Sequence, residues 1–201
     1  MSTTTYFHEM SVSVEPTTPV LTTEEVKDFT LIDYSTDDSY LDALVTVATK
    51  MTEKYLNRAL ITQTLVAYFR TYAGLIYLPH APIQSITAMV SIDSSNGETA
   101  LTEDQDYYVK GVNDKFIDMA NAYYLPAGHI KRDGDSNNSL KITYVAGYGD
   151  AASDIPAPIK EAIKRLVLYL YDKRDDVAMG VAISDMPITA ATLLDPYKNY
   201  S

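Results

Sequence analysis

Near the C-terminal end of the chain, apolar residues recur at every third or fourth position. This spacing places them on one face of an α-helix and predicts a helix over residues 157–174. Pro156 and Pro158 suit its start, because a proline there loses no intrahelical hydrogen bond. Lys173 and Arg174 suit its last turn, where the helix dipole stabilises positive charge. The apolar face consists of Ile159, Ala162, Ile163, Leu166, Val167, Leu170 and Tyr171.

The same predicted helix carries apolar residues away from that face. Leu168 points about 180° from Ile159, and Tyr169 lies on a flank with basic residues. One interpretation is a core helix with scattered apolar residues on its surface. The other is a helix that packs on its own core on one side and on a neighbouring subunit on the other. For the second interpretation, the candidate subunit-interface residues are Arg165, Leu168, Tyr169 and Lys173.

Two further helices are predicted near the N-terminus. Thr22 and Glu25 form a capping box, in which each side chain accepts a hydrogen bond from the other residue's backbone N–H, and the helix then covers residues 23–31. A second start signal at Thr36, followed by two aspartates in the first helical turn, predicts a helix over residues 38–56.

Between residues 58 and 149, the spacing of apolar residues changes from helical to alternating. β-Branched and aromatic residues are frequent in this part, which predicts about six short strands. Asn96-Gly97 predicts a type I′ hairpin turn, which requires positive φ at both residues. The whole pattern predicts an α+β fold, a small helical bundle with a β-rich insert. The predicted strands cover residues 61–69, 75–78, 83–92, 105–109, 115–119 and 140–145.

The two ends of the chain lack a clear period. Residues 1–20 are rich in Ser, Thr, Val and Pro, and we expect a flexible or partner-ordered arm, with an added strand over residues 6–14 as the alternative. Residues 177–201 are predicted to form an extended tail, whose apolar residues indicate docking on its own domain or on a partner. Residues 21–176 are then expected to form a single domain.

Composition narrows the class of protein. The 201 residues are 46% hydrophobic and 21% charged, which is typical of a globular chain, and no apolar run indicates a transmembrane helix or a signal peptide. The absence of cysteine excludes disulfides, thiolate zinc sites and a cysteine nucleophile. The net charge of −11 disfavours tight DNA binding but allows DNA to pass nearby. The 17 tyrosines suit protein interfaces and half-buried strands alike.

The sequence contains no recognisable site for catalysis, for a cofactor or for a metal. His8, His80 and His129 stand far apart and have no partners at metal-ligand spacing. The segment at residues 133–137 begins like a calcium-binding EF-hand loop. Asn138 and Tyr144 then stand where that loop requires glycine and glutamate, so a polar hairpin tip is the better interpretation. The sequence therefore offers no candidate active site.

Several segments, in this order, resemble the head–tail connector (adaptor) family of tailed bacteriophages. The resemblance covers residues 20–175, with two departures. The arms are longer than a minimal member needs, and a tryptophan often found in the insert is absent. The segments are Leu21-Thr-Thr-Glu-Glu-Val-Lys27, Glu53-Lys-Tyr-Leu-Asn-Arg-Ala-Leu-Ile-Thr-Gln63, Leu78-Pro-His-Ala-Pro-Ile-Gln-Ser-Ile86, Tyr144-Val-Ala-Gly-Tyr-Gly149, Ile155-Pro-Ala-Pro-Ile-Lys160 and Leu170-Tyr-Asp-Lys-Arg174.

The resemblance implies a structural virion protein without enzymatic activity, made in the host cytoplasm and assembled into the neck. Such proteins form a ring of about twelve copies under the portal protein, with a stopper or tail protein below, and DNA passes through the lumen without specific binding. No membrane is involved. Members commonly contact the portal through C-terminal segments, which here gives the candidate portal-binding residues Pro187, Leu193, Leu194, Pro196, Tyr197 and Tyr200.

Three alternatives remain open. A stopper or tail-completion protein also forms rings, although the β-rich insert favours the adaptor. A small hydrolase would need a site assembled from residues such as Asp106, Asp118 and Tyr148, which no spacing supports. A sugar- or receptor-binding module would use the tyrosine-rich insert.

Overall fold

The computed structural model describes residues 6–71, 75–93, 95–112, 115–119, 140–173 and 187–199. The chain forms two compact units. The first, the β unit, takes residues 1–15, 62–147 and 201. The second, the helical unit, takes residues 16–61 and 148–200. The β unit therefore contains most of the predicted insert, residues 62–147 of 58–149, and a single domain over residues 21–176 stays a prediction.

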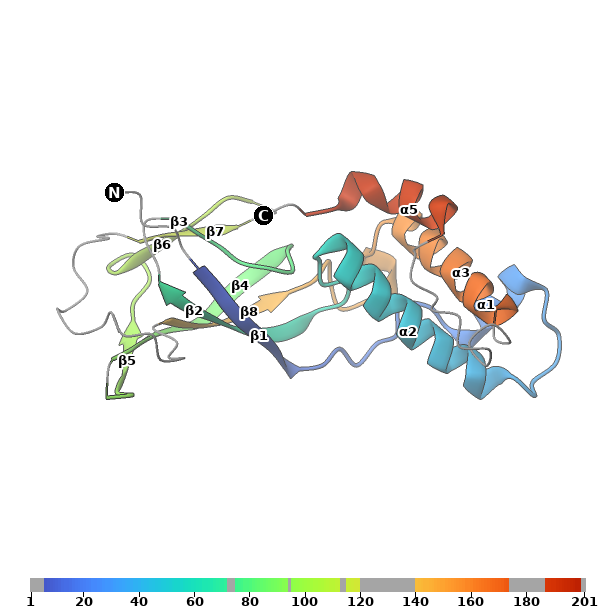
Figure 1. The fold of residues 1–201 in the computed structure, drawn as a ribbon, viewed down its shortest axis with the longest axis horizontal. Coiled ribbons are helices and arrows are strands. Elements are labelled where there is room, and N and C mark those ends of the chain that lie inside the picture. The colour runs from blue at the N-terminus through green and yellow to red at the C-terminus, as the bar shows by residue number, and fades with distance from the viewer. Residues whose placement is uncertain are drawn as a thin grey trace. The chain divides into compact units, whose positions relative to one another are not determined.

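The helical unit contains four described α-helices and two short 3-10 helices (Figure 1). The three predicted helices are confirmed to within two residues at each end. α1 begins with the predicted capping box, since the Thr22 hydroxyl accepts from the Glu25 N–H and the Glu25 carboxylate accepts from the Thr22 N–H. The elements are α1 (Thr23–Thr30), α2 (Asp38–Leu56), η1 (Ala152–Asp154), α3 (Ala157–Asp172), α5 (Ile188–Leu194) and η2 (Asp195–Tyr197).

One apolar core holds these helices together. The predicted stripe of α3 faces inward, with its first five positions buried and Leu170 and Tyr171 packed at the margin. Helices α1 and α2 bury their own apolar positions against it, as expected for amphipathic helices around a shared core. The fully or nearly buried members include Val26, Leu41, Leu44, Val45, Ala48, Leu56, Ile159, Ala162, Ile163, Leu166 and Val167.

The C-terminal segment is helical where an extended tail is expected. Residues 188–194 form α5, and Ala190 and Leu194, one turn apart, are both buried in the core of the helical unit. A helix of seven residues is too short to be stable in isolation, so its packing against the core must supply the stability. The sequence pattern of so short an element does not reveal this packing.

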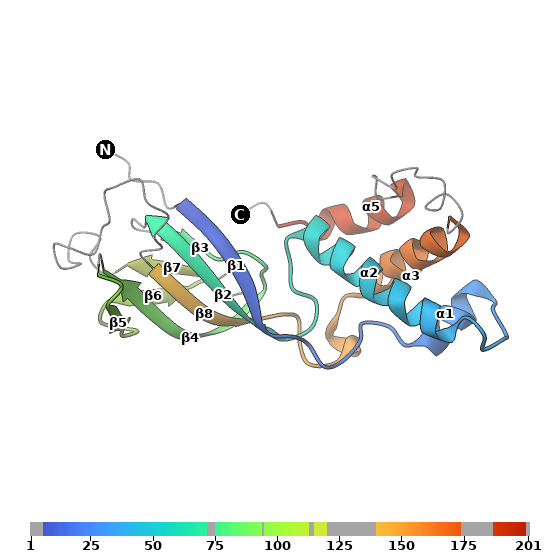
Figure 2. The same ribbon diagram turned by 60° about the horizontal axis from the view of Figure 1, so that its bottom comes forward.

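The β unit contains two antiparallel sheets. The strand order is β1-β2-β8-β4-β5 in the larger sheet, whose strands lie side by side in Figure 2, and β3-β7-β6 in the smaller. The six predicted strands are present, and β1 and β5 are additional. The strands are β1 (Tyr6–Val14), β2 (Gln63–Thr71), β3 (Leu75–Tyr77), β4 (Ile83–Ile92), β5 (Glu98–Leu101), β6 (Tyr107–Lys110), β7 (Phe116–Met119) and β8 (Leu140–Ala146).

β8 is the central strand of the larger sheet, and it alternates between buried and half-buried residues as a two-faced strand should. Its buried side chains face those of β2, with Leu65 opposite Tyr144 and Phe69 opposite Leu140. The buried Tyr144 hydroxyl donates to the Pro79 carbonyl at 2.9 Å, and burial raises the pKa of this phenol. Residues 6–14 extend the sheet as β1, which is the alternative to a loose arm.

The hairpin between β4 and β5 forms where the sequence predicts it, but its turn is not type I′. Of the predicted pair Asn96 and Gly97, only Asn96 has positive φ (65°), whereas a type I′ turn needs positive φ at both. The Asp93 carboxylate stabilises the turn instead, accepting from the backbone N–H groups of Ser95 at 2.8 Å and Gly97 at 2.7 Å. This local side-chain acceptor is typical of aspartate in turns.

Candidate interface surfaces

The described residues contain no group of three or more histidine, aspartate or glutamate side chains placed to hold a metal ion. No helix of the described ranges is both long and apolar enough to cross a bilayer. His80 lies in the connection between β3 and β4, where its φ is 58°. His129 and the loop at 133–137 lie outside the described residues.

The residues considered for a hydrolase have structural contacts in different places. The Asp106 carboxylate accepts from the Thr102 N–H at 2.8 Å and so closes a turn. Asp118 forms an ion pair with Lys110 across neighbouring strands β7 and β6. Tyr148 packs against the core of the helical unit, whereas both carboxylates belong to the β unit. These contacts explain the three residues without any catalytic role.

The outer flank of α3 is more exposed than its core face. Arg165 is exposed and pairs with Glu161 one turn earlier at 2.9 Å, and Leu168 is half-buried. Tyr169 also turns partly inward, because its ring packs against the helical core. The N–H of Lys173 donates to the Tyr169 carbonyl, and the lysine side chain is exposed at the end of the helix. All four predicted interface residues thus keep some surface outside the core, Arg165 and Lys173 more than the half-buried Leu168 and Tyr169.

The predicted tail residues lie on two sides of α5 and η2. Leu194 is completely buried, and Leu193 and Tyr197 are half-buried against the same core. Pro187 is the half-buried residue at which α5 begins, and Pro196 is exposed in η2. Tyr200 lies outside the described residues. Ile188, which the sequence did not single out, is 84% exposed.

The C-terminal segment also binds the end of α2 through polar contacts. The Tyr55 hydroxyl donates to the Asp195 carboxylate at 2.6 Å, and the Arg58 Nε donates to the Tyr197 carbonyl at 2.5 Å. The Asn199 N–H donates to the Leu56 carbonyl at 2.8 Å. Sequence reasoning missed these residues because their partners are about 140 positions away and no local pattern marks them.

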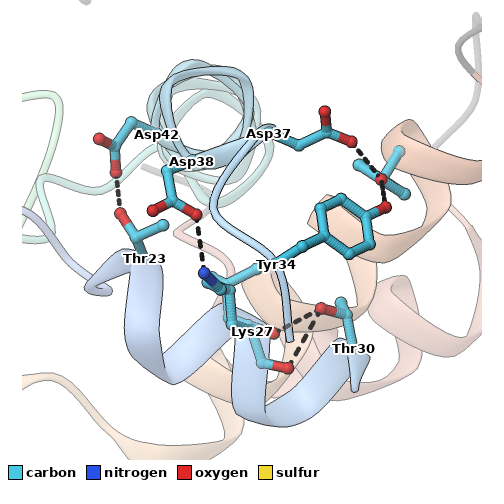
Figure 3. Close-up of polar contacts among 9 residues, drawn as sticks. Thr23, Lys27, Thr30, Tyr34, Asp37, Asp38 and Asp42 are labelled. Carbon is cyan, nitrogen blue, oxygen red and sulfur yellow. Dashed lines mark hydrogen bonds and ion pairs between the residues drawn. The ribbon is translucent and has the colours of Figure 1, made fainter. Parts of the chain in front are cut away.

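A second polar cluster joins the starts and ends of α1, α2 and α3 (Figure 3). The Lys27 Nζ pairs with Asp38 at 2.9 Å, which ties α1 to α2. The Tyr171 hydroxyl donates to Asp37 at 2.6 Å and lies 2.9 Å from the Tyr34 hydroxyl, which ties α3 to the α1–α2 connection. The hydrogen bond to the Asp37 carboxylate raises the pKa of Tyr171. These contacts hold α1, α2 and α3 in fixed positions relative to one another. The orientation of the α3 flank therefore depends on them.

The chain is similar to proteins of known assemblies. Residues 19–200 match the protein family described as "Head completion protein". Two similar solved chains are described as "Neck of empty GTA particle computed with C6 symmetry" (TM-score 0.73, 18% identity) and "Neck of native GTA particle computed with C12 symmetry" (0.72, 17%). A third is described as "Virion of native gene transfer agent (GTA) particle" (0.73, 19%). Each alignment covers 96% of this chain and 97% of the other. No curated protein matches the chain.

Proposed function

This chain belongs to the head completion protein family, and from that membership we propose that it forms a ring in the particle neck, between the portal of the head and the tail. The prediction of a structural virion protein, rather than an enzyme, is confirmed by the family. The single observation that carries the proposal is the family match over residues 19–200, which spans both units of the fold.

The ring itself is supported by the symmetry of similar assemblies. Chains with the same fold occur in necks computed with C6 and C12 symmetry. A closed ring needs heterologous contacts, in which one surface of each copy meets a different surface of the next. We propose about twelve copies, with the α3 flank of Arg165, Leu168, Tyr169 and Lys173 as one of the two surfaces.

The C-terminal segment is proposed to bind the portal protein. Leu194 then serves as the internal anchor that keeps α5 on the helical unit, because its side chain is completely buried. The exposed side of the segment, with Ile188 and Pro196 and the half-buried Leu193 and Tyr197, is left for the portal. Tyr200 belongs to the same proposed surface. Large apolar and aromatic residues dominate the binding energy of protein interfaces, and this segment is rich in them.

The acidic composition supports a passage for DNA rather than a DNA-binding site. The net charge of −11 disfavours the phosphate neutralisation on which tight DNA binding depends. Negative charge near a lumen keeps DNA mobile, and screening limits the effect to about 8 Å at physiological ionic strength. A stopper or tail protein is proposed as the partner on the tail side of the ring.

Particles produced without this chain test the proposed function directly. We expect filled heads and free tails that do not join, with joining restored when the full chain is supplied from a second copy of its gene. Normal tailed particles in the absence of the chain would overturn the proposal. Electron micrographs of both preparations give the fraction of heads that carry tails.

The portal-binding surface is tested with a matched pair of substitutions. Ile188→Asp places a charge on the proposed surface, and Val112→Asp places the same charge at an equally exposed position of the β unit (84% and 85%). We expect Ile188→Asp to weaken binding to purified portal at least about tenfold, because hot-spot contacts are worth about 1–2 kcal/mol or more. Val112→Asp should bind as the wild type does. Equal binding by both variants would place the portal contact elsewhere.

A further inference from the structure

Helix α1 is followed by a residue in a conformation that its side chain does not favour. Leu31 has φ 57° and ψ 33°, which is the left-handed region. Glycine or asparagine usually occupies this position at the end of a helix, because a larger side chain is strained there. The Leu31 side chain is nevertheless 89% exposed, more than any other large apolar residue in the described part of the chain. A leucine here therefore gives the single chain little packing in return for the strain.

Asp28 is a second unfavourable residue at the same end of α1. It is exposed and lies in the last helical turn, where the helix dipole destabilises negative charge. Within the described ranges, no lysine or arginine lies at ion-pair distance from its carboxylate. Glu24, one turn earlier, is in the opposite situation, because the dipole stabilises an acidic residue in the first turn. Asp28 and Leu31 together form one exposed surface, here called the α1 end.

Neighbouring residues that both oppose the local structural preference are typical of a functional surface. The α1 end presents an apolar side chain close to a negative charge. A partner that suits it carries an apolar side chain close to a positive charge, at a similar spacing. Such a contact would bury Leu31 and neutralise Asp28, so it would offset what both residues cost the single chain.

The flank of α3 has this chemistry. Arg165 is exposed, and Leu168, three residues later, is half-buried. Asp28 and Leu31 are also three residues apart, so the two members of each pair are separated by about 4.5 Å along the chain direction of a helix. Arg165 already pairs with Glu161, but a guanidinium group has further N–H donors and can bind a second carboxylate.

We propose that the α1 end is the second surface of the ring interface and binds the α3 flank of the neighbouring copy. In this contact Leu31 packs on Leu168, and the Asp28 carboxylate accepts from the Arg165 guanidinium. The inference rests on the proposed function, because a ring is what brings a different surface of the next copy to the α3 flank. Within one copy, α1 meets α3 through Glu25 and Lys160 instead, so the α1 end and the α3 flank both stay available.

Charge favours the α1 end over two other exposed apolar sites of the helical unit. The outer side of α2 exposes Val47, but Lys50 and Lys54 follow it one and two turns later on the same side. Their positive charges would repel the basic α3 flank. Ile188, at the start of α5, belongs to the proposed portal surface. Of these three sites, the α1 end is the one that carries negative charge next to its exposed apolar residue.

Cysteine cross-linking tests the contact directly, because the chain contains no cysteine of its own. The double variant Leu31→Cys/Leu168→Cys is assembled on purified portal and treated with a mild oxidant. We expect covalent oligomers of three or more copies on a non-reducing gel, since each copy is then bridged to both of its neighbours. Leu31→Cys/Val47→Cys is the matched control and should give at least about tenfold fewer, because a disulfide forms only between residues that lie close together. Equal yields from the two variants, or no such oligomers from the first, would overturn the inference.

An exchange of charges tests the ion pair without a new covalent bond. Asp28→Arg and Arg165→Asp are each expected to weaken assembly on the portal at least about tenfold, and the double variant should restore it, because opposite charges meet again. Asp150→Arg makes the same change at an exposed position elsewhere in the helical unit and should assemble as the wild type does. A double variant that assembles no better than the single ones contradicts the inference alone. Failure of the wild-type chain to join the portal contradicts the proposed function instead.

Discussion

At the scale of single residues, Leu194 shows what the C-terminal segment does in the free chain. Its side chain has no exposed surface and lies in the core with Ala190 and the apolar face of α3. The sequence placed Leu194 among the residues that meet the portal, because a local pattern shows only that a residue is apolar. The direction in which it points depends on packing partners far away in the chain. Tyr55 and Arg58 could not be found for the same reason.

A pair of alanine substitutions tests the packing of α5. Leu194→Ala is expected to lower the free energy of unfolding by about 2–4 kcal/mol, the usual cost of removing a completely buried leucine. Ile188→Ala, in the same helix but 84% exposed, should change it by less than about 0.5 kcal/mol. Urea denaturation followed by circular dichroism measures both. If the two variants lose the same stability, α5 is not docked as the structure has it.

The carboxylate of Glu25 makes a second test at this scale. The Thr22 N–H donates to it, and Lys160 lies 3.2 Å away, so the pKa of Glu25 falls below its ordinary value of 4.5, although partial burial opposes the change. A carboxylate whose pKa is lower in the folded state stabilises the fold above the unfolded pKa. That stabilisation is lost as the pH falls through the folded value.

We therefore expect the difference in melting temperature between the wild type and Glu25→Gln to be full at about pH 6 and to shrink below about pH 4.5. Glu24→Gln removes the same charge from the same helical turn but leaves the capping box intact, so it is the matched control. Thermal melts between these pH values decide the matter. A difference that does not change with pH would mean that the carboxylate acts only through its shape.

At the scale of the elements, the sequence predicted those helices and strands best in which the spacing of apolar residues repeats several times. Helices α2 and α3 have four or more turns, so their apolar stripes fix both existence and position. β5 has four residues and α5 has seven, too few for a period to be read, and both depend on neighbours for their stability. For β1, the sequence allowed an added strand as the alternative to a loose arm, and only the pairing with β2 distinguishes them.

A substitution at Gly147 tests the backbone conformation of the chain directly after β8. Its φ is 134°, a conformation that residues with a side chain rarely adopt, and its N–H donates to the Pro82 carbonyl at 3.0 Å. Gly147→Ala is expected to cost about 1–3 kcal/mol of unfolding free energy, because the alanine is strained in this backbone conformation. Gln84→Ala removes two side-chain hydrogen bonds of an exposed residue, one to the Gly147 carbonyl at 3.0 Å and one to the Thr62 hydroxyl at 2.8 Å, and should cost about 1 kcal/mol because water can replace them. Denaturation curves that show the reverse order would contradict the assignment.

At the scale of the whole molecule, the family and the fold agree while the binding surfaces stay proposals. The same two-unit fold occurs in the necks of gene transfer agent particles, and it covers nearly all of both chains. The sequence alone could indicate the family, because several short segments resemble its members and occur in the same order along the chain. The interfaces could not be predicted from the sequence, because contacts between copies produce no repeating pattern of apolar residues within one chain. The proposed surfaces therefore rest on the exposure and chemistry of their residues.

The mass of the complex formed with purified portal tests the central claim most directly. Light scattering after size-exclusion chromatography gives the mass of the full chain alone, of the portal alone and of their mixture. The proposed ring predicts a complex heavier than the portal by about twelve copies of the 22.3 kDa chain. A portal peak of unchanged mass, with the chain eluting separately, would contradict the account.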